Sequence, residues 1–198
     1  MQRFIALAVA SVFSAAAAAN AVVGQPAPAF NVTDLAGKPV SLADYKGKTV
    51  VLEWHNFGCP FVQKHYRSNN MQALQKKYGA DVVWLAVNST NKGSTDWTEA
   101  KALTAQLKDF GAQPARYLVD EPGKVGMAYG ARTTPHMYII DPKGTVVYNG
   151  AIDDKRSTSV ADVKTAKNYV VAALDELKAG KPVSVASTTP YGCSVKYK

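Results

Sequence analysis

The chain has 198 residues, of which 47% are hydrophobic and 19% are charged, and its formal net charge is +8. This length suits one domain with one substantial core. The lysines and arginines are scattered along the sequence, and no basic stripe interleaved with aromatic residues occurs. The positive charge therefore indicates a solvated basic surface, and we expect no nucleic-acid partner.

Residues 1–21 have the pattern of a signal peptide. Arg3 supplies a positive charge, residues 4–13 form an apolar run, and Ala19-Asn20-Ala21 is a small-x-small cleavage site. The apolar run is too short and too rich in alanine to predict a membrane span, and a retained N-terminal anchor is the alternative. We expect a periplasmic or secreted protein that is cleaved near Ala21 and has no membrane span afterwards.

The first elements after the signal peptide lead to a cysteine. Residues 30–32 and 40–42 predict a short N-terminal hairpin, and the apolar, β-branched run at residues 49–54 predicts a buried strand. Pro60 favours the first turn of a helix, so Cys59 stands at the joint between strand and helix. A thiol at this place faces unpaired N–H groups and the positive end of the helix dipole, which favour the reactive thiolate. The alternative is a buried apolar cysteine beside a strand.

The remaining elements alternate between helix and strand up to a late hairpin. In chain order we expect a helix from Pro60 to Gly79 that pauses at 68–70, a strand at 81–88, a helix at 96–110, a strand at 117–119, a helical turn at 125–129, strands at 136–140 and 145–148, and a helix from Ser159 to Gly180. A parallel crossover followed by an antiparallel hairpin predicts an α/β fold, with a mixed central sheet covered by helices on both faces. We place this domain at residues 22–180 and a C-terminal tail at residues 181–198.

Three segments carry a resemblance to a known family: NFGCPFVQKHY at 56–66, ARTTPHMYIIDPKG at 131–144 and YNGAIDD at 148–154. With them the chain resembles the redoxin family, the alkyl hydroperoxide reductase/thiol-specific antioxidant, peroxiredoxin-like branch of the thioredoxin fold. The resemblance covers residues 23–179 and implies a thioredoxin-like fold. It implies a thiol–disulfide oxidoreductase or a peroxiredoxin-like antioxidant protein that needs neither a cofactor nor a metal. The implied substrates are protein thiols and disulfides or peroxides, with an unidentified thiol reductant.

The sequence departs from the family pattern around its cysteine. Thioredoxins use Cys-x-x-Cys, whereas residues 59–62 end in valine. Asn56 stands where peroxiredoxins have a threonine and where some peroxiredoxin-like relatives have a cysteine. Peroxiredoxins also carry an arginine near the position of Pro135, and here the arginine, Arg132, comes three residues earlier. These departures predict at most a weak thiol peroxidase.

The resemblance implies roles for individual residues. Cys59 is the expected nucleophile, and the Thr134–Pro135 bond is expected to be cis and to lie against it, offering backbone groups to an incoming peptide or thiol. Asn56 either donates an amide hydrogen bond toward Cys59 or ends the strand with a side-chain turn. We expect Lys64 to be solvated, the alternative being that it stabilises the thiolate.

The tail has no helical or strand period but carries several apolar residues, so we expect it to dock on the domain. It also holds Cys193, the second of the two cysteines in the chain, in a turn-forming Pro-Tyr-Gly-Cys sequence. Because no Cys-x-x-Cys partner follows Cys59, we expect Cys193 to act as its resolving cysteine. The alternative is a disulfide between Cys193 and another subunit or another protein.

Two other classes of function compete with this reading. His55 and His136 lie near Cys59 in the expected fold, and a thiolate with imidazole suits copper or zinc. Strand alternation nevertheless points His55 and Trp54 to opposite faces, and no second nearby cysteine completes a ligand set. The other class is a non-catalytic binding module in which a Cys59–Cys193 bridge is structural.

Overall fold

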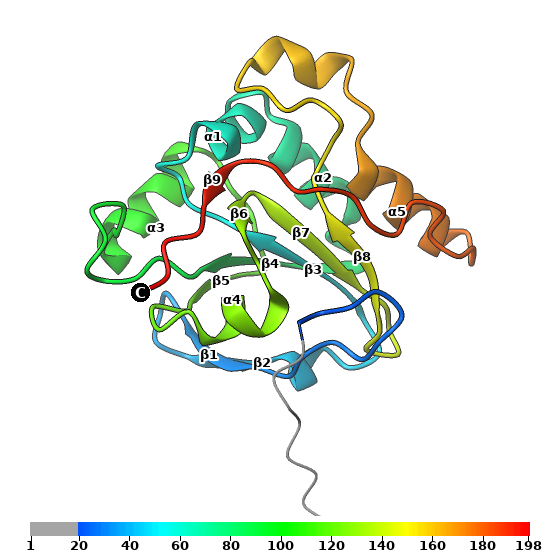
Figure 1. Ribbon diagram of the computed structural model, residues 1–198, viewed down its shortest axis with the longest axis horizontal. Coiled ribbons are helices and arrows are strands. Elements are labelled where there is room, and N and C mark those ends of the chain that lie inside the picture. The colour runs from blue at the N-terminus through cyan, green and yellow to red at the C-terminus, as the bar shows by residue number, and fades with distance from the viewer. Residues whose placement is uncertain (1–19) are drawn as a thin grey trace, which may run out of the picture.

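The computed structural model describes residues 20–198 (Figure 1). The charged start, the apolar run and the beginning of the cleavage site of the expected signal peptide lie outside the described residues. Among residues 20–198, no helix combines the length and the apolar character that a membrane span requires.

A seven-stranded mixed sheet forms the centre of the molecule. Its strands are β1 (Asn31–Asp34), β2 (Pro39–Ser41), β3 (Thr49–Trp54), β4 (Val82–Asn88), β5 (Arg116–Val119), β7 (His136–Ile140) and β8 (Val146–Gly150), in the order β2-β1-β5-β4-β3-β7-β8. Strands β3, β4 and β5 are parallel, while β7 and β8 on one side and β1 and β2 on the other run antiparallel to their neighbours. The expected α/β arrangement with a mixed sheet is confirmed.

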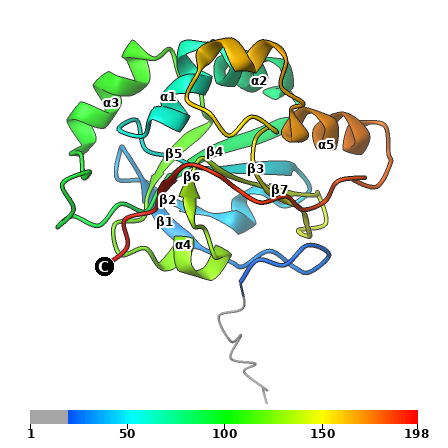
Figure 2. The ribbon, with the colours of Figure 1, turned by 45° about the horizontal axis from the view of Figure 1, so that its top comes forward.

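Helices cover both faces of the sheet (Figure 2). The structure has α1 (Pro60–Arg67), α2 (Asn70–Tyr78), α3 (Ala100–Asp109), α4 (Lys124–Tyr129) and α5 (Tyr169–Lys178), with short 3-10 helices η1 (Leu42–Tyr45) and η2 (Val160–Lys164). Apolar side chains of α1, α2 and α5 share one core cluster, and those of α4 share another with Phe30 and Trp54. Because β3 sends alternate side chains into these two clusters, it is buried on both faces, which explains its continuous apolar sequence.

Two expected helix starts are wrong. The helix expected at Asp96 begins at Ala100, with Glu99 as its N-cap, because the Asp96 carboxylate instead lies 3.6 Å from Lys196 Nζ. The helix expected from Ser159 is only the short η2, and α5 begins later, at Tyr169. There the Asn168 side chain accepts a hydrogen bond of 3.0 Å from the Val171 N–H, so asparagine is the true cap.

The tail runs back across the molecule to the N-terminal end of α1 (Figures 1 and 2). Its strand β9 (Cys193–Ser194) pairs antiparallel with β6 (Thr133–Thr134), so that Cys193 lies opposite Thr134. Beyond β9, the Val195 N–H donates to the Arg132 carbonyl at 3.0 Å, and the Tyr197 hydroxyl donates to the Ala131 carbonyl at 2.8 Å. The tail is therefore docked on the domain.

Candidate active site

Cys59 lies where the loop after β3 enters α1. It is the N-cap of the helix, with Pro60 in the first turn, and its side chain is only 3% exposed. Its Sγ donates a hydrogen bond of 2.9 Å to the carbonyl oxygen of Thr134. The thiol is thus held between a helix N-terminus and the backbone before Pro135.

The Thr134–Pro135 peptide bond is cis, as predicted. The bond from Cys59 to the Thr134 carbonyl also places this loop against the thiol. Gly192 of the tail lies against the same carbonyl, where a Cβ atom would lie 2.0 Å from the Thr134 oxygen. Only a residue without a side chain fits between the tail and this loop.

Asn56 shapes the loop before Cys59. Its Oδ1 accepts a hydrogen bond of 2.7 Å from the Gly58 N–H, and its Nδ2 donates to Thr90 Oγ1 at 3.0 Å and to the Asp96 carbonyl at 3.3 Å. Its amide is fully engaged by these partners, so the side-chain turn, and not the bond toward Cys59, is the arrangement observed. The peroxiredoxin arginine has no counterpart here either, since Arg132 is exposed and does not line the site.

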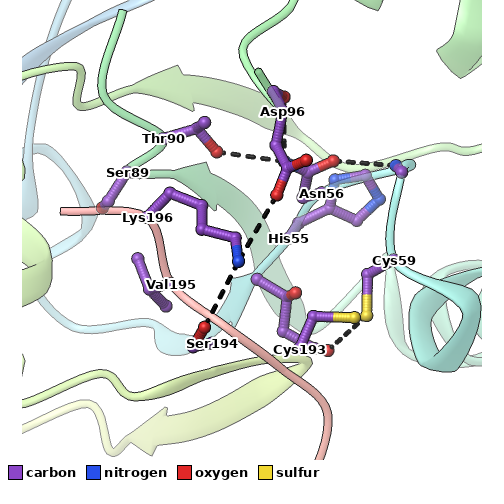
Figure 3. Close-up of a pocket in the computed structure, with 12 residues that line it drawn as sticks. His55, Asn56, Cys59, Ser89, Thr90, Asp96, Cys193, Ser194, Val195 and Lys196 are labelled. Atoms are coloured by element: carbon purple, nitrogen blue, oxygen red, sulfur yellow. Dashed lines mark hydrogen bonds and ion pairs between the residues drawn. The ribbon is translucent and has the colours of Figure 1, made fainter. Parts of the chain in front are cut away.

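Cys193 enters the site from the tail, and its sulfur lies beside that of Cys59 (Figure 3). Both cysteines are free thiols in this structure. The pKa of Cys193 is raised to about 12, first by burial and then by its hydrogen bond to Cys59 and the charge of Cys59. Around the two sulfurs is a cavity of about 30 Å³, which Asn56 and Thr134 also line.

His136 is held by partners other than the cysteines, whereas the buried Nε2 of His55 has no hydrogen-bond partner among the described residues. His55 shares the cavity wall with Cys59, and its Nδ1 lies 3.2 Å from the Tyr117 hydroxyl. His136 uses both ring nitrogens, with Nε2 at 2.8 Å from Asn149 Oδ1 and Nδ1 accepting from the Arg132 N–H at 3.2 Å. Burial lowers the pKa of His55 to about 3 and that of His136 to about 4, so both are neutral at neutral pH. Within residues 20–198, no three His, Cys, Asp or Glu side chains are grouped as metal ligands.

Lys64 is not solvated, contrary to expectation. Its side chain is fully buried, and its Nζ lies 3.5 Å from Asp153 Oδ2, 2.8 Å from the Lys155 carbonyl and 3.2 Å from the Tyr191 hydroxyl. Tyr191 in turn donates a hydrogen bond to Asp153. The sequence gives little sign of this group, because its members come from α1, from the loop after β8 and from the tail.

Glu53 is a second buried charge that the sequence reasoning missed. It lies on β3 and is fully buried, and its carboxylate accepts hydrogen bonds from Trp84 Nε1 at 2.8 Å and from the Tyr66 hydroxyl at 3.1 Å. Burial raises the pKa of this carboxyl to about 7. The available signal was a lone acidic residue inside an otherwise apolar strand sequence.

Comparison with known proteins places this site in a family. The model of the AhpC/TSA family matches residues 23–149. Thiol-disulfide oxidoreductase ResA of Bacillus thuringiensis subsp. konkukian is 27% identical over 63% of this chain and 67% of its own length. Thioredoxin-like protein YneN of Bacillus subtilis is 30% identical over 71% of this chain and 79% of its own length. The crystal structure of an uncharacterized conserved protein from Geobacillus kaustophilus superposes with a TM-score of 0.75, at 30% identity, over 89% of this chain and 93% of that one. The expected resemblance is confirmed, and the chain belongs to the AhpC/TSA family.

Proposed function

We propose that this protein is a thiol–disulfide oxidoreductase in which Cys59 is the nucleophile and Cys193 is the resolving cysteine. The observation that carries the proposal is the meeting of the two thiols at the N-terminus of α1, with Cys193 in register opposite Thr134. The name of the relative ResA supports the same class of reaction. The reaction is an exchange of two electrons between the substrate disulfide and the two thiols of the chain.

The exchange has two steps. The Cys59 thiolate attacks one sulfur of the substrate disulfide, forms a mixed disulfide and releases the first substrate thiolate. Cys193 then loses its proton to solvent and attacks Cys59 Sγ, which releases the second substrate thiolate and leaves a Cys59–Cys193 disulfide. An external thiol reductant returns both cysteines to thiols.

The neighbouring thiol orders these steps. Part of the increase in the pKa of Cys193 comes from the hydrogen bond and the charge of Cys59. Both effects end when Cys59 enters a mixed disulfide, so Cys193 becomes a better nucleophile only after the first step. Burial, the largest cause of the raised pKa, still favours its thiol form.

A peroxide is the second candidate substrate, favoured by the small size of the cavity beside Cys59. Attack on the peroxide O–O bond gives a Cys59 sulfenic acid and an alcohol or water, and condensation with Cys193 gives the same disulfide and one water. The engaged amide of Asn56 and the exposed side chain of Arg132 support only weak activity of this kind. The competing copper hypothesis finds less support, because both ring nitrogens of His136 already have partners.

We place this activity outside the cytoplasm, in the periplasm or a secreted location. The proposal rests on the signal-like pattern of residues 1–21. An oxidising compartment is also where a disulfide between the two cysteines persists.

The Cys193→Ser variant tests the proposed function. After exposure to a peptide disulfide, we expect this variant to hold the peptide as a mixed disulfide on Cys59, because the second attack is lost. The wild-type protein is expected to give a monomer with a Cys59–Cys193 cross-linked peptide, and the Cys59→Ser control is expected to form neither. Mass spectrometry under non-reducing conditions distinguishes these products. A free Cys193 in oxidised protein that still turns over contradicts the proposal, as does a dimer linked through Cys193.

A further inference from the structure

A buried polar cluster ties the tail to α1. We call Lys64, His65, Asp153 and Tyr191 the tail cluster; their side chains are at most 3% exposed. The Tyr191 hydroxyl donates a hydrogen bond to Asp153 and accepts hydrogen bonds from Lys64 Nζ at 3.2 Å and from His65 Nε2 at 3.4 Å. The Asn70 amide donates to His65 Nδ1 at 2.9 Å, which leaves the Nε2 hydrogen for the hydroxyl. The Tyr191 ring also packs edge-on against Phe61, with 5.8 Å between the ring centroids.

The contribution of this cluster to stability does not by itself explain its polar composition. Burying a charge pair carries a large desolvation cost, and well-packed apolar residues of similar size are often at least as stable. What the polar cluster adds is direction, because the Tyr191 hydroxyl contacts both members of the Lys64–Asp153 pair and completes its hydrogen bonding. In this fold that hydroxyl comes from the tail, 127 residues after Lys64 along the chain. The cluster therefore fixes the position of the tail on α1.

Tyr191 is also well placed to control the thiols. It lies two residues before Cys193, and on the far side Val195 is fastened to Arg132 by its N–H. Between these two attachments the tail covers Cys59, which is 3% exposed and lines the small cavity. The space beside the two thiols is small, so it favours a small reagent over a peptide disulfide at Cys59.

We propose that Tyr191 is the latch of a C-terminal strap, residues 190–197. While its hydroxyl is bound by Asp153 and Lys64, the strap holds Cys193 beside Cys59 and closes Cys59 to bulky disulfides. Release of Tyr191 opens Cys59 to peptide substrates, whereas small oxidants reach it with the strap closed. The inference rests on the proposed function in one respect, because it assigns the strap to the two reactive thiols.

The test uses the full chain with Cys193→Ser, so that Cys59 is the sole thiol. The rate of Cys59 modification is measured with two reagents of the same exchange chemistry, the small methyl methanethiosulfonate and the disulfide dimer of a short synthetic peptide. Adding Tyr191→Phe removes only the latching hydroxyl. Because hydrogen bonds to buried charged groups are lost, we expect the peptide disulfide to react about tenfold faster or more, and the small reagent to change by less than about twofold. The matched control, Tyr45→Phe on η1, changes a tyrosine on the opposite face of the sheet and is expected to alter neither rate.

A second variant separates the strap from its latch. Gly192→Ala places a Cβ atom against the Thr134 carbonyl and keeps the Tyr191 hydroxyl, and we expect it to raise the peptide rate as well. If Gly192→Ala raises that rate and Tyr191→Phe does not, closure of Cys59 by the strap is supported and the latch role of Tyr191 is overturned. Equal changes with both reagents, or no change in either variant, overturn the whole inference. If Cys59 reacts with neither reagent in any variant, the proposed function fails too. A peptide rate that is already high with Tyr191 intact is compatible with the proposed function but contradicts closure of Cys59 by the strap.

Discussion

At the scale of single residues, the two thiols have different surroundings, which fit the different roles proposed for them. Cys59 stands at the N-cap of α1, at the positive end of the helix dipole, and its thiol donates a hydrogen bond to the Thr134 carbonyl. Cys193 comes from a strand in the tail, and burial together with the neighbouring Cys59 raises its pKa to about 12. This asymmetry suits a first nucleophile and a second thiol that waits until the first has reacted.

The buried Glu53 carboxyl gives a prediction on pH. Its pKa is raised from 4.5 to about 7 in the folded protein, so the folded state binds a proton that the unfolded state has lost in this range. Its contribution to the free energy of unfolding is therefore full below about pH 4.5 and falls as the pH rises to about 7, by up to about 3 kcal/mol. Glu53→Gln has no such titration.

Urea denaturation of wild type and Glu53→Gln from pH 4.5 to 7 measures this effect. We expect the free energy of unfolding of the variant to increase relative to that of wild type as the pH rises. The buried histidines have lowered pKa values and act in the opposite sense, but they are present in both proteins and cancel in the difference. A difference that stays constant with pH would show that burial does not raise the pKa of the Glu53 carboxyl.

Prediction from sequence succeeded for residues whose position is set by the local sequence or by the fold family. The place of Cys59 followed from the strand before it and Pro60 after it, and the cis Pro135 followed from the family resemblance. The burial of Lys64 could not be predicted in this way. A lysine beside a histidine reads as a solvated helix surface, and its partners Asp153 and Tyr191 reach it only through the tertiary fold.

At the scale of elements, strands were easier to place than helix starts. A buried strand such as β4 is marked by a continuous apolar run, whereas a helix start depends on which polar side chain forms the N-cap hydrogen bond. Asp96 was expected as a cap but is paired with Lys196 of the tail, and that competition is invisible in the local sequence. The break between η2 and α5 was missed because Asn168, the actual cap, lies inside an apparently helical stretch.

The N-terminal segment gives a prediction at this scale. Ala21 is 4% exposed, and its carbonyl accepts a hydrogen bond of 3.3 Å from Asn149 Nδ2. Cleavage directly after Ala21 would remove this buried contact, whereas Ala17-Ala18-Ala19 is also a small-x-small site and leaves it intact. We therefore expect the exported protein to begin at Asn20.

N-terminal sequencing of the exported protein checks this expectation. A first residue of Asn20 supports it, and a first residue of Val22 would mean that the mature fold does without the Ala21 contact. Retention of Arg3 on the exported chain would instead favour the N-terminal anchor.

At the scale of the whole molecule, the sheet order explains how distant segments meet. Strand β3 lies between β4 and β7, so the C-terminal end of β3, which leads to Cys59, adjoins the start of β7, just after Pro135. Strand β9 then adds Cys193 to the free side of β6. The fold class predicts that the end of β3 and the start of β7 adjoin. It does not predict the place of the tail, which depends on Tyr191 and on the pairing of β9 with β6.

The proposed disulfide should therefore stabilise the whole domain and not only the site. A Cys59–Cys193 bond closes a loop of about 130 residues in the unfolded chain, and the chain-entropy model gives up to about 4–5 kcal/mol for a loop of that size. The thiols already lie side by side, and the tail is docked by strand pairing and by Tyr191, so the bond forms without moving the domain. We expect oxidised wild type to unfold at a higher denaturant concentration than reduced wild type. Cys193→Ser should match the reduced protein under both conditions. If oxidation leaves the midpoint of the wild type unchanged while the bond is present by mass spectrometry, the gain is lost to strain in the folded state.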